Sequence, residues 1–186
     1  MVGQEATSEA GTPAVSTTTK LIDDEDLRRL FDYWRAQRRG RRMPSRGDID
    51  PLDIGWALSR IFLVDYTAAE GLVYRLAGAD IASVFGRGNL KGLQPRDFLP
   101  PDRADAIEAA FMRVIEEPAV MVMRGMVYLR ADRLPMGERI FLPLANRDRD
   151  AANGVLGMTV VHSETTGVPT AAAHAMPNFI PVDDIP

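Results

Sequence analysis

Hydrophobic positions recur at two different spacings along this chain, and the spacing changes where the expected secondary structure changes. Between residues 23 and 40 they fall three and four residues apart, which is typical of a helix with one buried face. Asp23 or Asp24 can cap the first turn, and Gly40 is a natural stop. The apolar face of this predicted helix consists of Leu27, Leu30, Phe31 and Trp34.

Short runs rich in β-branched, aromatic and aliphatic residues follow this helix and predict strands. Five such runs are present, at 61–66, 72–76, 120–129, 138–145 and 155–161. The first two are close enough to form a hairpin, and Asp, Asn, Gly and Pro between the last three suit antiparallel connections. Pro143 has no backbone N–H, so we expect it at an edge or a bulge.

Two helical segments separate the two groups of strands. The first is brief and ends at Gly86, and the second runs from Asp102 with apolar residues at helical spacing until Pro118 stops it. Gly86, Gly88 and Gly92 lack the spacing of a dinucleotide fingerprint, so we interpret them as turn residues.

Length and composition indicate one globular domain. The chain has 186 residues, of which 46% are hydrophobic, enough for one core but not for two. We predict disorder for 1–20, which is small and polar, and for the Pro-rich tail 166–186, although Phe179 and Ile180 can dock on the domain. The predicted domain is 21–165, with its first helix inside 21–43.

Charge and residue types exclude several classes of function. A net charge of -4 gives no general attraction to nucleic acid or anionic membranes. There is no apolar run of membrane-spanning length and no secretory signal, so we expect a cytoplasmic protein that does not bind membranes. No nucleophile–base pair, metal-ligand cluster or phosphate loop is evident, so we expect a non-catalytic protein without a metal site.

Arginines of the first helix and the segment after it form the strongest charge block, at Arg28, Arg35, Arg38, Arg39, Arg41, Arg42 and Arg46. The simplest interpretation is a solvated face paired with nearby carboxylates. The alternative is an Arg-driven nucleic-acid-binding protein. The apolar face of the same helix can pack on the domain or on a second copy of itself.

Several segments together resemble a bacterial PAS-like family, namely single-domain PAS proteins with an Arg-rich N-terminal helix. They are the Arg-rich helix running into RRMPSRGDIDPLDI, then FLVDY, VYRLAGADIASVFGR with Gly92, FLPPDRADAI, ERIFLPLANRD and GVLGMTVV, spanning about 27–161. The resemblance implies an α+β fold, with an antiparallel sheet of about five strands, small helices on one face that wall a pocket, and an N-terminal helix.

The resemblance also implies a sensory or interaction role in bacterial signalling, but no particular ligand, so the cofactor stays unknown. The chain has no cysteine, which excludes flavin–thiol and thioester-linked chromophores. The two histidines, His162 at a strand end and His174 in the tail, are poorly placed as haem ligands. Non-covalent flavin, a fatty acid or another small apolar ligand remains open.

If a pocket is present, we expect its lining to mix apolar side chains with a few polar groups. The candidates are Tyr74, Ile81, Phe85, Phe98, Phe111, Met123, Tyr128 and Met158. Ordinary core packing explains the same pattern. Arg75 and Arg124 lie within predicted strands and can meet an anionic ligand, although such arginines more commonly face outward.

We therefore predict a non-catalytic regulatory module that binds a small ligand, a signalling protein or both. Leu27, Leu30, Phe31 and Trp34 are the candidate surface for a partner or for a homodimer. Nucleic-acid binding is the alternative.

Overall fold

The helices and strands follow the predicted order. The computed structural model describes residues 18, 20–128, 133–146, 151–167 and 176–186. Its helices are α2 (Glu25–Gln37), α3 (Ala79–Val84) and α4 (Pro101–Glu116). Its strands are β1 (Ile61–Thr67), β2 (Gly71–Ala77), β3 (Ala119–Met126), β4 (Arg133–Ala145), β5 (Ala152–Thr166) and β6 (Asn178–Pro181). Within these ranges, no helix combines the length and apolar character needed to cross a membrane.

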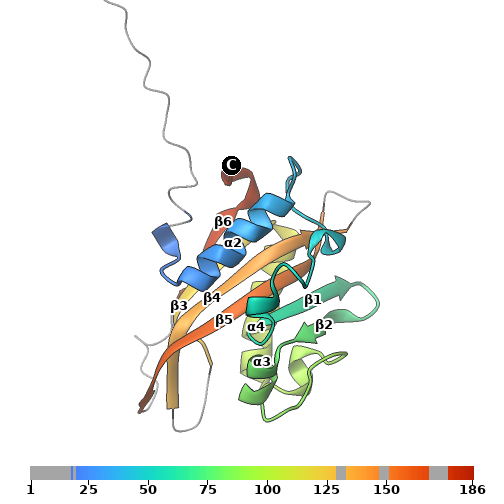
Figure 1. Cartoon of the computed structure of the whole chain (residues 1–186). Coiled ribbons are helices and arrows are strands. Elements are labelled where there is room, and N and C mark those ends of the chain that lie inside the picture. The colour runs from blue at the N-terminus through green and yellow to red at the C-terminus, as the bar shows by residue number, and fades with distance from the viewer. Residues whose placement is uncertain (1–17, 19, 129–132, 147–150, 168–175) are drawn as a thin grey trace, which may run out of the picture.

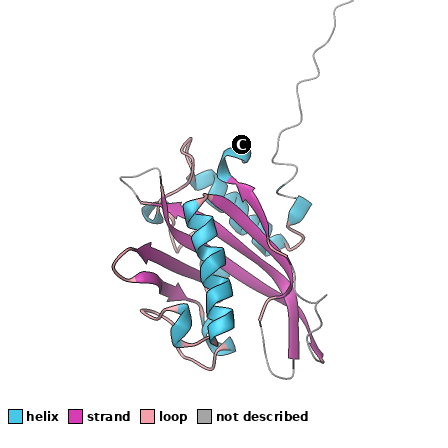
Figure 2. Ribbon diagram, turned by 180° about the vertical axis from the view of Figure 1, so that it is seen from behind, coloured by secondary structure: helices cyan, strands magenta, loops and turns pink. Residues whose placement is uncertain are grey.

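The strands form one antiparallel sheet in the order β2-β1-β5-β4-β3-β6. The sequence predicts about five strands, and the sixth comes from the C-terminal segment. Views from opposite sides place α2 over one face of the sheet and α4 over the other (Figures 1 and 2). We call these the α2 face and the α4 face.

Cross-strand pairing decides which side chains reach each face, because paired residues of neighbouring strands point to the same side. Phe62 and Phe141 both pair with Gly157, and both rings contact Phe111 of α4. These positions therefore belong to the α4 face. Side chains alternate along a strand, so Met158, the next residue of β5, belongs to the α2 face.

The α2 helix forms as the sequence predicts. The Asp24 carboxylate accepts a hydrogen bond from the backbone N–H of Leu27 at 3.0 Å and so caps the first turn. The helix buries its predicted apolar face, Leu27, Leu30, Phe31 and Trp34, each at most 1% exposed. The indole N–H of Trp34 donates to the carbonyl oxygen of Pro143 at 2.9 Å.

The prediction of these four residues as a partner surface is therefore wrong for this conformation. Their side chains pack on the sheet of their own chain, which is the other possibility that the amphipathic pattern left open. An apolar stripe on a helix predicts that this face is buried, but it does not predict which part of the protein buries it.

The end of the chain also differs from the sequence-based prediction. Disorder was expected over 166–186, but Asn178–Pro181 forms β6 beside β3, and Val182 and Ile185 are buried. Proline is compatible with a short edge strand, because one side of that strand needs no backbone donor. Almost all of the N-terminal segment 1–20, also expected to be disordered, lies outside the described residues.

Arginines attach this C-terminal segment to the helix end. The Arg42 guanidinium bonds both carboxylate oxygens of Asp183 at 2.6 Å, and Arg38 donates to the carbonyl oxygen of Ile185 at 2.6 Å. The segment is therefore part of the folded domain.

Pro143 occupies a place that proline tolerates. β4 is an interior strand and not the expected edge, but the described pairing of β3 with β4 ends at Phe141, so Pro143 lies beyond it and pairs with Val155 of β5. The missing backbone donor of proline is tolerated beyond the end of a strand pairing.

Gly157 offers a direct test of the α4 face. A Cβ atom at this position would lie 2.0 Å from Cζ of Phe62, so the ring would have to move. We expect Gly157→Ala to lower the free energy of unfolding by about 1–3 kcal/mol, since overpacking strains a filled core. Chemical denaturation followed by circular dichroism measures this loss. Gly88→Ala is the control, because open space surrounds that position, and equal stability of both variants would contradict the described packing.

Candidate functional site

The α4 face brings together most of the residues predicted to line a pocket. Tyr74 lies 5.5 Å from Phe98 and 6.2 Å from Phe111 between ring centroids. Phe85 lies 4.8 Å from Phe98 and 5.9 Å from Tyr128. These five rings form a continuous cluster, which we call the aromatic cluster.

Two other candidates lie beside this cluster and one does not. Ile81 is buried in α3, one helical turn before Phe85. Met123 is half-buried and pairs with Arg139, which lies two residues before Phe141 on the same face. Met158 was expected in the lining, but it pairs with Ile61 and Ile140 on the α2 face. That part of the prediction is wrong, because register and not hydrophobicity decides the face.

The rings of the cluster pack against one another. Phe111 is fully buried and Tyr74 is 6% exposed, and edge-to-face contacts dominate. A ligand on this face would therefore have to rearrange side chains at the margin of the cluster.

Arg139 lies at that margin and is the residue that the sequence interpretation missed. Its Nε donates to Oγ1 of the buried Thr159 at 2.9 Å, and its Nη2 donates to the carbonyl oxygen of Val127. Its guanidinium carbon lies 5.0 Å from the centroid of the Tyr128 ring, a cation–π distance. All three partners are neutral.

A signal for Arg139 is present in the sequence. In ERIFLPL the alternating positions place Glu138, Ile140 and Leu142 on one side and Arg139 and Phe141 on the other. A charged residue on the side that carries Phe141 is unusual for a core-facing position. The strand prediction alone did not identify that side as the core side.

The phenol of Tyr74 interacts electrostatically with the Arg139 guanidinium. Burial raises the pKa of its phenol above the ordinary value, and the positive charge of Arg139 opposes that rise. The phenol therefore stays protonated at neutral pH and can donate a hydrogen bond.

On the α2 face, the residue that precedes Arg139 in β4 forms a different polar site. Glu138 is 2% exposed, and its carboxylate accepts hydrogen bonds from the backbone N–H groups of Asp23 and Asp24, at 3.2 and 2.7 Å. The same carboxylate forms an ion pair with Arg124 of β3. A buried carboxylate at the positive end of the α2 dipole fixes the helix start on the sheet.

Neighbouring groups extend this attachment, which we call the α2 anchor. Arg124 also pairs with the Asp23 carboxylate at 2.6 Å and donates to the carbonyl oxygen of Leu21 at 2.7 Å. Nε2 of His162, near the end of β5, lies 3.0 Å from the Asp24 carboxylate. Arg124 is thus structural, and Arg75 likewise pairs with Asp65 and Glu70.

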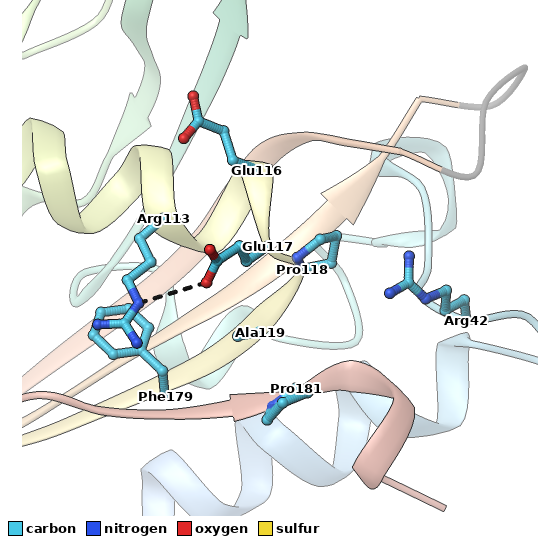
Figure 3. Close-up of a pocket in the computed structure, with 8 residues that line it drawn as sticks. All are labelled: Arg42, Arg113, Glu116, Glu117, Pro118, Ala119, Phe179 and Pro181. Carbon is cyan, nitrogen blue, oxygen red and sulfur yellow. Dashed lines mark ion pairs between the residues drawn. The ribbon is translucent and has the colours of Figure 1, made fainter.

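An open depression of about 420 Å³ lies elsewhere, between the end of α4 and β6 (Figure 3). The Arg113 guanidinium lies 3.9 Å from the centroid of the Phe179 ring and pairs with Glu117 at 4.0 Å. None of the predicted pocket residues lines this depression. We regard the α4 face as the candidate site, because aromatic rings and polar groups converge there.

Among the described residues, four of the seven arginines in the block pair with carboxylates of the same chain. Arg35, Arg41, Arg42 and Arg46 pair with Asp32, Asp48, Asp183 and Asp65, respectively. These pairs agree with the expected solvated face and reduce the charge available to phosphates. Over the ranges that the structure describes, no three His, Asp or Glu side chains gather as a metal site.

Comparison with known proteins gives one result. The family model of the PAS domain matches residues 22–160, which is most of the chain and runs from the start of α2 into β5. No curated protein and no solved structure matches the chain.

The α2 anchor can be tested with Glu138→Gln. The amide removes the charge paired with Arg124, so we expect a loss of about 1–3 kcal/mol in the free energy of unfolding. Amide hydrogen exchange should increase first in α2. Glu117→Gln is the matched control, since that carboxylate is 80% exposed. If both variants exchange as the wild type does, Glu138 does not hold the helix.

Proposed function

Because the chain belongs to the PAS domain family, whose members generally act as non-catalytic sensory or regulatory modules, we propose that it is a sensory module with a two-sided sheet. A small ligand binds at the margin of the aromatic cluster on the α4 face. Its binding changes how the start of α2 is held on the opposite face. The signal leaves through α2 toward a signalling protein.

The observation that carries this proposal is the adjacency of two functional side chains in β4. Glu138 reaches the start of α2, and Arg139, the next residue, contacts Thr159, Val127 and Tyr128 on the other face. A shift of the β4 backbone at this point moves both groups. The two faces are thus joined by a single peptide unit.

Gly137 precedes this peptide unit and allows the backbones of β4 and β5 to approach each other closely. The pairing of β4 with β5 shifts here, because Met136 pairs with Ser163 and Gly137 with Val161, so His162 is the extra residue of a bulge in β5. A Cβ atom at Gly137 would lie 1.9 Å from the carbonyl oxygen of Val160, so the two backbones approach closely there. The bulge bends β5 and increases the local twist beside Glu138 and Arg139 of β4, which supports a functional position for these two residues.

The size of the response has a thermodynamic limit. A ligand shifts the position of α2 only by the difference between its affinities for the two arrangements. Coupling is also reciprocal, so a change in the α2 anchor must change ligand affinity by the same factor.

Native mass spectrometry of freshly purified protein tests the proposal. We expect a small molecule bound to the wild type, and an ultraviolet–visible spectrum of the same sample identifies a chromophore. We expect Glu138→Gln to change the bound fraction, with a shift in affinity of about fivefold or more. Glu117→Gln should retain the wild-type fraction. Equal occupancy in all three proteins would contradict coupling, and a wild type that binds no small molecule would contradict ligand sensing.

A further inference from the structure

We propose that the ligand is a small monocarboxylate with an apolar body, and that the Arg139 guanidinium binds its carboxylate. This inference rests on the proposed function and specifies its ligand class.

The charge of Arg139 has no carboxylate partner among the described residues. The guanidinium is half-buried, and its partners among the described residues are a hydroxyl, a carbonyl oxygen and an aromatic ring. Many of the other arginines pair with carboxylates, as Arg60 does with Asp26 and Arg96 with Glu108. Partial burial of a charge without a counterion is unfavourable, and a bound anion would relieve it.

The donor geometry of Arg139 suits a carboxylate. A guanidinium presents parallel N–H groups that match the two oxygens of a carboxylate. In the part of the chain that the structure describes, Nη1 of Arg139 has no hydrogen-bond partner. The Tyr74 hydroxyl likewise has no such partner among the described residues, and its charge environment includes both Arg139 and Tyr128. Both groups thus keep a donor that a bound carboxylate can use.

Aromatic and apolar side chains lie beside Arg139. Tyr128 contacts Phe85, which contacts Phe98, so the rings lead away from the guanidinium. Met123, opposite Arg139 on β3, is half-buried, and its flexible thioether side chain adapts to different shapes. A ligand that places its carboxylate on Arg139 can lay an apolar body against these side chains.

The charge balance favours a monoanion. One guanidinium compensates one negative charge, and the aromatic rings carry no positive charge that would compensate a second. A dicarboxylate or a phosphate dianion would leave a charge unpaired beside the rings, which costs binding free energy.

Calorimetric titration of the full chain with sodium hexanoate and sodium benzoate tests the inference. Hexanamide and benzamide are the matched neutral probes, because they keep the shape and remove the charge. We expect the carboxylates to bind and the amides to bind at least about tenfold more weakly, since hydrogen bonds to charged groups are the stronger ones.

The variants assign this binding to Arg139. Arg139→Gln should weaken hexanoate binding by about tenfold or more, and Arg139→Lys, which keeps the charge and loses the planar fork, should weaken it less. Arg75→Gln is the control, because Arg75 pairs with Asp65 and Glu70 at the surface. Circular dichroism establishes that each variant folds, and if Arg139→Gln does not fold, Arg139→Lys gives the comparison.

Three results would overturn the inference: carboxylates and amides that bind equally, hexanoate binding that is unchanged in both Arg139 variants, or no binding of either carboxylate at millimolar concentration. If native mass spectrometry finds a bound neutral molecule together with one of these results, the proposed ligand class is wrong but the sensory function is still supported. If it finds no bound molecule, that result counts against the sensory function and against the ligand class.

Discussion

The arrangement of this domain depends on a buried carboxylate that holds a helix on a sheet. Glu138 accepts two backbone hydrogen bonds at the start of α2 and pairs with Arg124, while being almost completely removed from water. A carboxylate buried in this way is stable only when all its partners stay in place. The position of α2 is therefore sensitive to small movements of β4, and the next residue of β4 faces the other side.

Much of the fold could be predicted from the sequence, because its elements have strong local signals. The apolar spacing in α2, the capping Asp24 and the short runs of strand-forming residues determine local structure almost without tertiary context. The strand β6 could not be predicted in this way. Its four residues follow Pro177 and end in Pro181, and they become a strand because β3 offers an unpaired edge and Val182 is buried.

The candidate site was harder to predict, because it depends on register. Hydrophobic character placed Met158 with the aromatic cluster, whereas cross-strand pairing places it on the α2 face. The arginines singled out from the sequence, Arg75 and Arg124, both have carboxylate partners in the structure. The side of β4 that carries Arg139 is identified as the aromatic side by a tertiary contact, that of Phe141 with Phe111 of α4, which no local pattern predicts.

Hydrogen exchange of the α2 amides, measured with and without saturating hexanoate, reports whether β4 couples the two faces of the sheet. If β4 couples the faces, hexanoate changes exchange in the first turns of α2 by about fivefold or more. Saturated binding at Arg139 with unchanged exchange in α2 would show that the two faces are not coupled.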